Sequence, residues 1–461
     1  MKHLKRIGLA VLLIGSALIG TIGARWVASR TQSPASLGAD LDPNAPAPLT
    51  PSTISTDTII TNLQGYLQLH PADSLAYSNL GIAYLQKARE TGDPAFYAKA
   101  DAVLAKALAL APNDFRALTG AGALALARHQ FQNALILGQR AQAVNPYNAG
   151  AYGIVGDAHI ELGQYPEAFD TFQHMVNLRP DLTSYARISY ARELSGDRPG
   201  AIAAMAQASE AGGVAGEGVA WARVQLGNLY FDQGDTSQAE QTYQAALVAW
   251  PNYPYAEAGL ANVWAAMGNT TQAISMYTHV VNTYPLPQFV ITLGDLYAVS
   301  GQPAAAAQQY ALVDAEQQLY IANGVDVDSE LALFDADHDR NLPEAVDRAR
   351  AGYARRPSVT VADMLAWTLY KAGDYQEAQT TMRQAQRLGT RNALMFYHAG
   401  MIAYRLGQSA EAAANLDRAL TLNPHFSVLY ADSARQLLAT LRSLSPSTLD
   451  TSNALFGGIT R

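Results

Sequence analysis

Two histidines and two glutamates fall within twenty residues of one another in the stretch 155–180. His159, Glu161, Glu167 and His174 carry imidazole and carboxylate groups. Such groups bind zinc, or act as a general acid and base, when the fold brings them to one point. Sequence proximity does not establish this, so the elements that carry these residues decide the question.

A second candidate is the acidic segment "DADHDRNLPEAV". Asp335, Asp337 and Asp339 alternate like the first ligands of a calcium-binding loop. Such a loop also needs glycine at its sixth position and a bidentate acid at its twelfth, and Arg340 and Val346 stand there instead. A divalent-cation site near these aspartates, in an accessory subunit, therefore stays open as an alternative function.

Other catalytic motifs are absent. The stretch "GAGALA", residues 120–125, resembles a dinucleotide-binding loop, but no strand precedes it and no acid follows where the ribose needs one. Phosphate-loop, zinc-protease and nucleophile-elbow patterns are missing. The chain has no cysteine, which excludes disulfides, thiolate metal sites and a cysteine nucleophile. We expect no catalytic residue, no metal ligand and no cofactor, and therefore no enzyme.

Length and composition favour an ordered, helical, multi-unit protein. The chain has 461 residues, too many for one ordinary core, and is 49% hydrophobic and 15% charged. Alanine is abundant, which favours helices. The formal charge is −8, and removing the five cations of the first thirty residues leaves 26 basic against 39 acidic side chains, or −13. Such a surface repels phosphates, so no nucleic-acid partner is expected.

The N-terminus has the pattern of an export signal. Lys2, Lys5 and Arg6 precede the uncharged apolar run 7–22. Residues 1–30 are therefore predicted to be a signal peptide or an uncleaved signal anchor, and the sequence leaves both open. With the basic end inside, the rest of the chain is expected outside the cytoplasm, in the periplasm or at the cell surface. It would be anchored in the inner (cytoplasmic) membrane by this N-terminal helix, its only membrane contact.

A period of 34 residues runs through the chain after a flexible, proline-rich linker at 31–56. It is marked by prolines 34 residues apart, at positions 112, 146 and 180 and again at 251 and 285. Other residues repeat in register with the prolines. Before Pro180 these are Gly156, Gly163, Ala168 and Phe172.

This pattern resembles the tetratricopeptide repeat, a helix-turn-helix unit of 34 residues. The resemblance implies an all-α, right-handed superhelical solenoid over residues 57–442, with a flexible tail at 443–461. An N-terminal helix at 57–69 and a C-terminal one at 426–441 would flank the units. The ten expected units begin near Ser74, Phe115, Ala149, Leu182, Ala220, Pro254, Pro287, Asp326, Val359 and Ala393.

The residues that repeat have physical roles. The glycine after leucine, such as Gly227, and the alanine that opens the second helix are expected where two backbones cross closely. The glycine between the helices is expected in a left-handed turn. His159 occupies the place of a first-helix tyrosine, while His174 lies on the second, antiparallel helix. We therefore expect both histidines to be structural and not metal ligands.

In the family, groove residues come from the second, fifth, ninth and twelfth places of each unit. The resemblance thus implies a non-catalytic scaffold that binds an extended segment of a protein or peptide partner in its concave groove. Its candidate groove residues here are Asp157, Asn228, Asn262, Asp295, Trp367, Tyr370, Tyr397 and Tyr404. The asparagines could each grip a backbone amide, and Gly153, Ala186 and Ala258 would leave room for a chain. The aromatic residues could be binding anchors or could pack against the following unit.

One departure from the family concerns its carboxylate clamp. Members that bind a C-terminal carboxylate carry Lys and Arg at the fifth and sixth places. This chain has Val224-Gln225 and Ala258-Gly259 at those places. A carboxylate clamp is therefore not expected. A role in envelope assembly or secretion follows from the fold by analogy alone.

Overall fold

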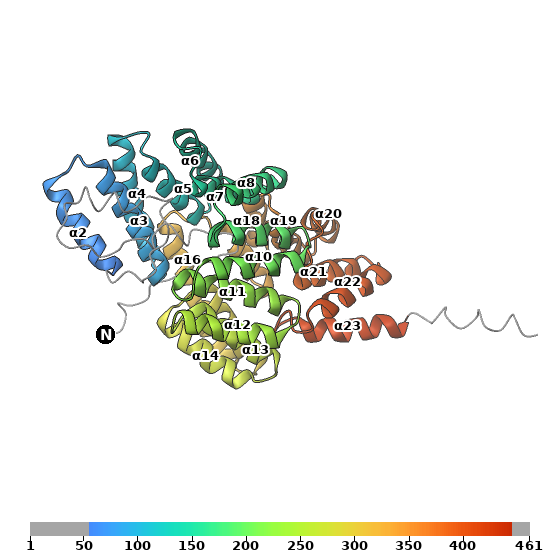
Figure 1. The fold of residues 1–461 in the computed structure, drawn as a ribbon. Coiled ribbons are helices and arrows are strands. Elements are labelled where there is room, and N and C mark those ends of the chain that lie inside the picture. The colour runs from blue at the N-terminus through green and yellow to red at the C-terminus, as the bar shows by residue number, and fades with distance from the viewer. Residues whose placement is uncertain (1–54, 445–461) are drawn as a thin grey trace, which may run out of the picture.

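The computed structural model describes residues 55–444 as a solenoid in which every regular element is an α-helix (Figure 1). The all-α repeat solenoid predicted from the sequence is confirmed. No helix in this part of the chain combines the length and apolarity needed to cross a membrane. The expected signal or anchor, almost all of the linker and nearly the whole tail lie outside the described residues.

Ten consecutive helical pairs stand between two single helices, α2 (Thr56–Leu69) and α23 (Ala431–Leu444). The first helices of the pairs are α3 (Ser74–Thr91), α5 (Phe115–Ala127), α7 (Ala149–Glu161), α9 (Leu182–Leu194), α11 (Glu217–Asp232), α13 (Pro254–Ala266), α15 (Pro287–Val299), α17 (Asp328–Asp337), α19 (Val359–Ala372) and α21 (Ala393–Arg405). The second helices are α4 (Ala95–Leu110), α6 (Phe131–Val144), α8 (Tyr165–Leu178), α10 (Arg198–Ala211), α12 (Thr236–Ala249), α14 (Thr270–Thr283), α16 (Pro303–Ala322), α18 (Leu342–Arg355), α20 (Tyr375–Ala385) and α22 (Ser409–Leu422). We number the pairs as units 1 to 10.

Helix α23 begins five residues later than the sequence suggested. The Ser427 side chain accepts hydrogen bonds from the backbone N–H groups of Leu429 and Tyr430, at 3.2 and 3.3 Å. These bonds stabilise a turn, because a serine hydroxyl can replace the helical acceptor. The helix then packs on unit 10 through Ala434 and Leu438.

In several units the repeated glycine fits against an aromatic ring. A Cβ atom at Gly156 would lie 2.2 Å from Phe172 Cε1, and one at Gly227 would lie 2.5 Å from Tyr243 Cε1. The expectation that two backbones cross here is therefore corrected. The glycine makes space for the ring of the second helix, because a ring this close leaves no room for a methyl group.

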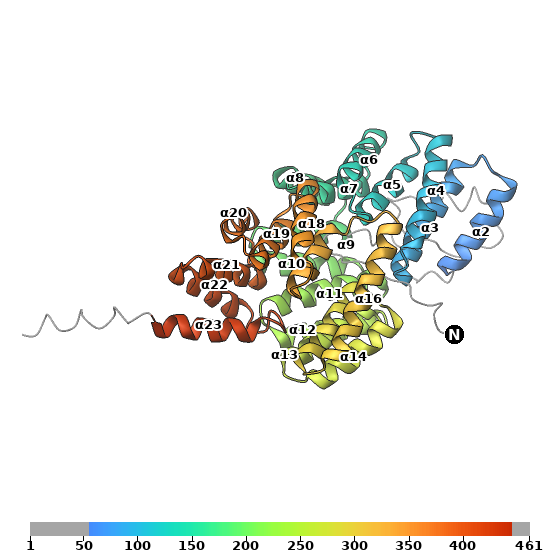
Figure 2. The same cartoon turned by 180° about the vertical axis from the view of Figure 1, so that it is seen from behind.

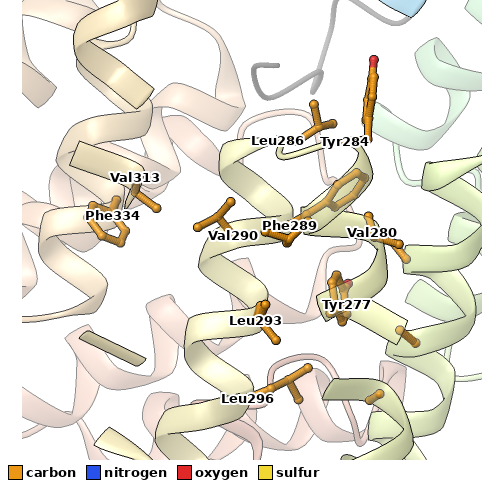
Figure 3. Packing of buried hydrophobic residues seen from close by; sticks show 14 residues of the cluster. Tyr277, Val280, Tyr284, Leu286, Phe289, Val290, Leu293, Leu296, Val313 and Phe334 are labelled. Atoms are coloured by element: carbon orange, nitrogen blue, oxygen red, sulfur yellow. The ribbon is translucent and has the colours of Figure 1, made fainter. Parts of the chain in front are cut away.

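The first helices line the inner side of the solenoid. In most of the solenoid the first helices of consecutive units contact one another, as α17 and α19 do, while second helices pack mainly on first helices. Neighbouring units share apolar clusters. In one of these, Tyr277 of α14 packs with Phe289 and Leu293 of α15, beside Val313 of α16 (Figure 3). This arrangement places the first-helix side chains that are not used in packing on the concave surface.

The solenoid winds so tightly that its second turn rests on its first. We call the segment between the two helices of a unit its hairpin turn, and the segment before a unit its linker loop. Hairpin turns bond to the linker loop six units further on, across 192–197 residues of sequence. The bonds include Asp326 O to His129 Nδ1 at 2.7 Å, Val359 N to Tyr165 Oη at 2.6 Å, Thr390 Oγ1 to Leu194 O at 2.5 Å and Asn423 Nδ2 to Phe231 O at 2.9 Å. Figures 1 and 2 accordingly show α18 beside α7 and α8 from both sides.

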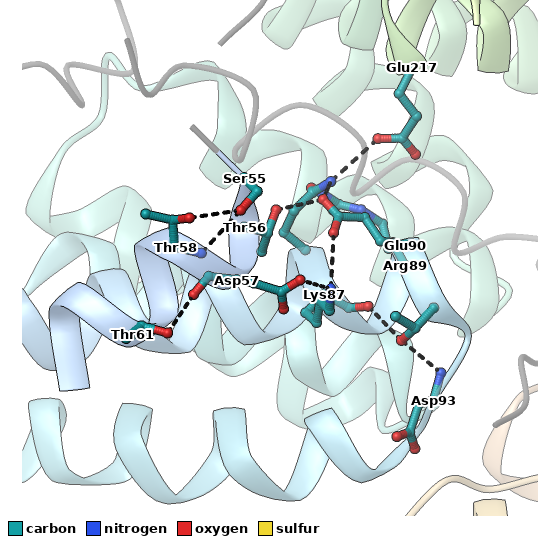
Figure 4. Close-up of polar contacts among 12 residues, drawn as sticks. Ser55, Thr56, Asp57, Thr58, Thr61, Lys87, Arg89, Glu90, Asp93 and Glu217 are labelled. Atoms are coloured by element: carbon teal, nitrogen blue, oxygen red, sulfur yellow. Dashed lines mark hydrogen bonds and ion pairs between the residues drawn. The ribbon is translucent and has the colours of Figure 1, made fainter. Parts of the chain in front are cut away.

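The N-terminal helices follow the same winding. Lys87 of α3 pairs with Asp57 of α2 at 2.7 Å (Figure 4). Unit 1 is also bonded to the linker loop six units further on, because the Tyr284 hydroxyl in the loop before unit 7 donates to the carbonyl of Arg89. The docking of one turn on the next thus extends from unit 1 to the end of unit 10.

Turn glycines offer a matched test of this docking. Gly196 and Gly301 both have left-handed backbones, with φ of +77° and +73°. A Cβ at Gly196 would lie 2.5 Å from the Gly389 carbonyl oxygen of the next turn, whereas nothing lies within 4 Å at Gly301. Gly301→Ala should cost only the conformational strain, about 1–2 kcal/mol. Gly196→Ala should cost roughly 1–3 kcal/mol more, because a clash is added. Urea unfolding midpoints measure the difference, and equal losses would contradict the docking.

Candidate functional site

Three consecutive units share one polar contact on the concave side. The ninth-place residue of the first helix accepts a hydrogen bond from a tyrosine fifteen positions later, on the second helix. The pairs are Asn228 with Tyr243 at 2.7 Å, Asn262 with Tyr277 at 2.6 Å and Asp295 with Tyr310 at 2.8 Å. Each tyrosine hydroxyl occupies one oxygen of its partner and fixes the orientation of that side chain.

Asn228 and Asn262, which we call the asparagine pair, keep their amide nitrogens available. Asn228 is exposed and Asn262 is half-buried. Their Oδ1 atoms accept from the tyrosines, so each Nδ2 points its two donors elsewhere. Within residues 55–444, neither Nδ2 has a hydrogen-bond partner. The pair thus presents four N–H donors from adjacent units.

Asp157 is held by a neighbouring cation. Arg187 donates to both of its carboxylate oxygens, at 2.9 and 2.7 Å, and both residues are buried. Burial raises the pKa of Asp157 to about 6, although Arg187 acts to lower it. The space expected at Gly153 is also filled, because a Cβ there would lie 2.8 Å from Arg187 Cζ. Asp157 is therefore paired, and the space beside Gly153 is occupied by the Arg187 guanidinium.

Asp295 is likewise engaged. In addition to Tyr310 it bonds to His338 Nε2 at 2.9 Å, while His338 Nδ1 lies 2.7 Å from the Phe334 carbonyl oxygen. Two acceptors on opposite sides of the ring favour the doubly protonated imidazole. Burial opposes that charge, yet the bond to Asp295 leaves the pKa of His338 raised. Asp295 therefore stabilises the joint between units 7 and 8.

Three of the four aromatic candidates form a core with the C-terminal segment. Trp367 is 1% exposed, donates from Nε1 to Asp337 at 2.7 Å, and stacks on Tyr370 with ring centroids 4.7 Å apart. Tyr397 stacks on Tyr430, which precedes α23, at 5.0 Å. Of the two roles left open by the sequence, packing against the following unit describes these three. Tyr404 remains 42% exposed at the hairpin turn of unit 10.

The histidine and glutamate quartet does not converge. His159 Nδ1 bonds to Gln164 Oε1 at 2.6 Å, which agrees with a structural role. His174 lies exposed on α8 beside the ring of Tyr152, at 4.5 Å. Glu161 is buried and faces a different part of the molecule.

The aspartates of the calcium-like segment bind different partners. Asp335 pairs with Arg348, Asp337 accepts from Trp367 and Tyr430, and Asp339 pairs with Lys371 at 2.7 Å. Nowhere in residues 55–444 do three or more histidine, aspartate or glutamate side chains gather around a possible metal position. These contacts give no support to the cation alternative.

Glu161 joins a buried ion triad between the two superhelical turns. Arg356 donates from Nε to Glu161 at 2.6 Å and from Nη1 to Glu330 at 2.8 Å. All three side chains are less than a tenth exposed, and the guanidinium lies 5.2 Å from the ring of Phe131. Sequence reasoning missed this contact, since the partners are 195 residues apart. The only signal in the sequence was Glu161 itself, a charged residue at a position where the repeat does not require one.

A second buried carboxyl group, that of Glu316, has no such partner. Glu316 of α16 is 2% exposed, and neither of its carboxylate oxygens has a hydrogen-bond partner among the described residues. Burial raises the pKa of this carboxyl to about 9. The side chain is therefore neutral in the folded protein at pH 7.

Comparisons with known proteins agree on the repeat. Tetratricopeptide repeat models match residues 190–254, 230–289 and 364–425. No curated protein shows significant similarity to the chain.

Solved structures similar to this chain include a thermophilic tetratricopeptide protein of Thermus thermophilus. It is 22% identical over 37% of this chain and 92% of its own, with a TM-score of 0.34. The Cut9–Hcn1 hetero-tetramer of the APC/C is 15% identical over 84% of this chain and 83% of its own, with a TM-score of 0.37. YrrB, described as having an unusual peptide-binding site, is 20% identical over 42% and 95%, with a TM-score of 0.27.

Removing the central cation of the triad should open the superhelix. Arg356→Met leaves two buried carboxylates unpaired and should cost about 3–5 kcal/mol. The triple change Arg356→Met, Glu161→Met and Glu330→Met should recover most of that loss, because no buried charge remains. Chemical unfolding measures both, and small-angle scattering should show an expanded particle for the single variant only. A triple variant as unstable as the single one would contradict this explanation.

The raised pKa of Glu316 should make the free energy of unfolding depend on pH. Its pKa is 4.5 in the unfolded chain and about 9 in the folded one, so between these values the folded state holds a proton that the unfolded state has released. The free energy of unfolding should therefore fall as pH rises from about 5 to 9. Glu316→Gln should flatten this decline, while Glu411→Gln on the exposed face of α22 should not. Melting temperatures across the pH range provide the measurement.

Proposed function

Because the chain belongs to the tetratricopeptide-repeat proteins, which bind protein or peptide partners, we propose that it is a non-catalytic scaffold for an extended segment of another protein. The segment lies along the inner surface, on the first helices of the central units. The proposal is supported by the asparagine pair, whose amide donors have no partner within residues 55–444.

The geometry of the pair suits an extended backbone. Helices in contact lie about 8–10 Å apart, and α11 and α13 are in contact. An extended chain covers about 3.3–3.6 Å per residue, so the two asparagines are separated by roughly three residues of ligand. Each Nδ2 then donates to a backbone carbonyl, which makes recognition largely independent of the ligand's side chains.

A binding role also agrees with how the chain uses its reactive side chains. The imidazole of His338 and the carboxylates of Asp157 and Asp295 form hydrogen bonds inside and between units. None of these groups is paired with a second reactive group at an accessible surface.

We further propose that this binding takes place at the cell envelope. The support is the basic and apolar pattern of residues 1–30, which is typical of an export signal or an anchor. Membrane fractionation of the full-length chain, compared with a chain that starts at Gln32, tests the proposal. Equal partition of both into the soluble fraction would contradict anchoring.

The asparagine pair can be tested without disturbing its tyrosines. Asn228→Asp with Asn262→Asp keeps the oxygen that accepts from each tyrosine, as Asp295 does naturally, but removes the four donors. Binding of peptides selected from a displayed library on the wild-type chain should fall by roughly 5-fold to 150-fold, the loss expected for two hydrogen bonds of about 0.5–1.5 kcal/mol each. Helicity and melting temperature should stay close to wild type.

The matched control changes two exposed asparagines on the outer helices. Asn133→Asp with Asn177→Asp adds the same charge away from the inner surface and should leave peptide affinity unchanged. If both double variants bind equally well, the asparagine pair is not the binding site.

A further inference from the structure

The docking between superhelical turns uses two kinds of edge. The hairpin turns of units 1–5 form one side of this internal interface, and the linker loops before units 7–10 and before α23 form the other. Each of these bonds joins a hairpin turn to the linker loop six units further on. The interface is therefore a row of equivalent contacts, and its length is set by the number of units present.

Each kind of edge also occurs in a part of the solenoid that makes none of these docking bonds. One other bond reaches it, from Gln86 Nε2 of unit 1 to Glu217 Oε2 at the start of unit 5, at 3.5 Å. We call the linker loops before units 1–6, with the last residues of the helices that lead into them, the N-facing edge. The hairpin turns of units 6–10, with the last residues of their first helices, are the C-facing edge. A Cβ at the docked glycines Gly163 or Gly196 would lie 2.5 Å from a carbonyl oxygen of the other turn. At Gly268 and Gly407 of the C-facing edge, nothing lies within 4 Å among the described residues.

Exposed apolar side chains gather on these two edges. On the N-facing edge they are Leu69, Leu110, Val144, Tyr147, Val214, Val248 and Trp250, with Tyr147 77% and Val214 89% exposed. On the C-facing edge they are Met267, Val299 and Tyr404. A hydrogen bond of 3.1 Å from Gly216 N to Ala249 O holds the loop of Val214 beside Val248 and Trp250. Apolar residues collected at one kind of surface indicate a contact that covers them.

We propose that the N-facing edge of one copy of this protein docks on the C-facing edge of a second copy. The second copy is the occupant because each free edge is built like one half of the interface that the chain already forms with itself. Docking of this kind joins two different surfaces, so it is head-to-tail and can extend into a filament. The inference stands apart from the proposed function, since it concerns the rims of the solenoid and not its inner surface.

Association can be measured on the full-length chain by sedimentation equilibrium in a density-matched detergent. The weight-average mass should rise above the monomer value of 49.3 kDa as concentration increases. Tyr147→Asp breaks the N-facing edge and Met267→Asp breaks the C-facing edge, so each variant alone should remain monomeric. Both positions are more than half exposed, so circular dichroism should show unchanged helicity.

Mixing the two variants gives the sharpest result. Each keeps one intact edge, so an equimolar mixture should form a dimer that does not grow further. Ile136→Asp, at a 49% exposed position in the middle of α6 and away from both edges, should assemble like wild type.

The proposal is overturned by three outcomes. A wild-type chain that stays monomeric at every concentration would mean that the edges receive a different protein or none. Assembly that survives in both single variants would place the contact elsewhere. A mixture of variants that stays monomeric would exclude a head-to-tail contact. None of these results bears on peptide binding by the asparagine pair.

Discussion

The docking of the second superhelical turn on the first is the constraint on which the form of this molecule depends, and the ion triad of Arg356 with Glu161 and Glu330 is buried within it. A guanidinium buried between two carboxylates is stable only if all three remain together, because an unpaired buried charge is costly. Here the three groups come from units 3 and 8 and from the loop before unit 9, so they stay together only while the second turn lies on the first. Loosening the turns would break both ion pairs, so the triad favours the wound form.

The need to pair buried charged groups also explains the positions of the reactive side chains. The carboxylates and imidazoles that first suggested chemistry hold units or turns in place, as Asp157 does with Arg187 and Asp295 with His338. The binding that we propose uses neutral groups instead: two carboxamides, oriented by tyrosines of the outer helices.

Local features of the fold could be predicted from the sequence, and distant ones could not. Gly163 and Gly196 indicate left-handed turns, and the 34-residue period predicts the paired helices, because both act within one unit. The bond between Asn228 and Tyr243 could also have been found, since an Asn or Asp with a Tyr fifteen residues later recurs in three units. The contact of Glu161 with Arg356 depends on the small rotation of each unit relative to the previous one, added over six units. No local sequence pattern predicts that total rotation.

Contacts across turns change how this solenoid should lose its structure. In a simple repeat array each unit touches only its neighbours, so the ends can melt while the middle persists. Here the hairpin turns of units 1–5 also contact segments six units later. Separating one unit therefore breaks its contacts with the neighbouring units and its contacts with the other superhelical turn. Fraying is thereby coupled to loss of the whole winding, and denaturation should approach a single cooperative event.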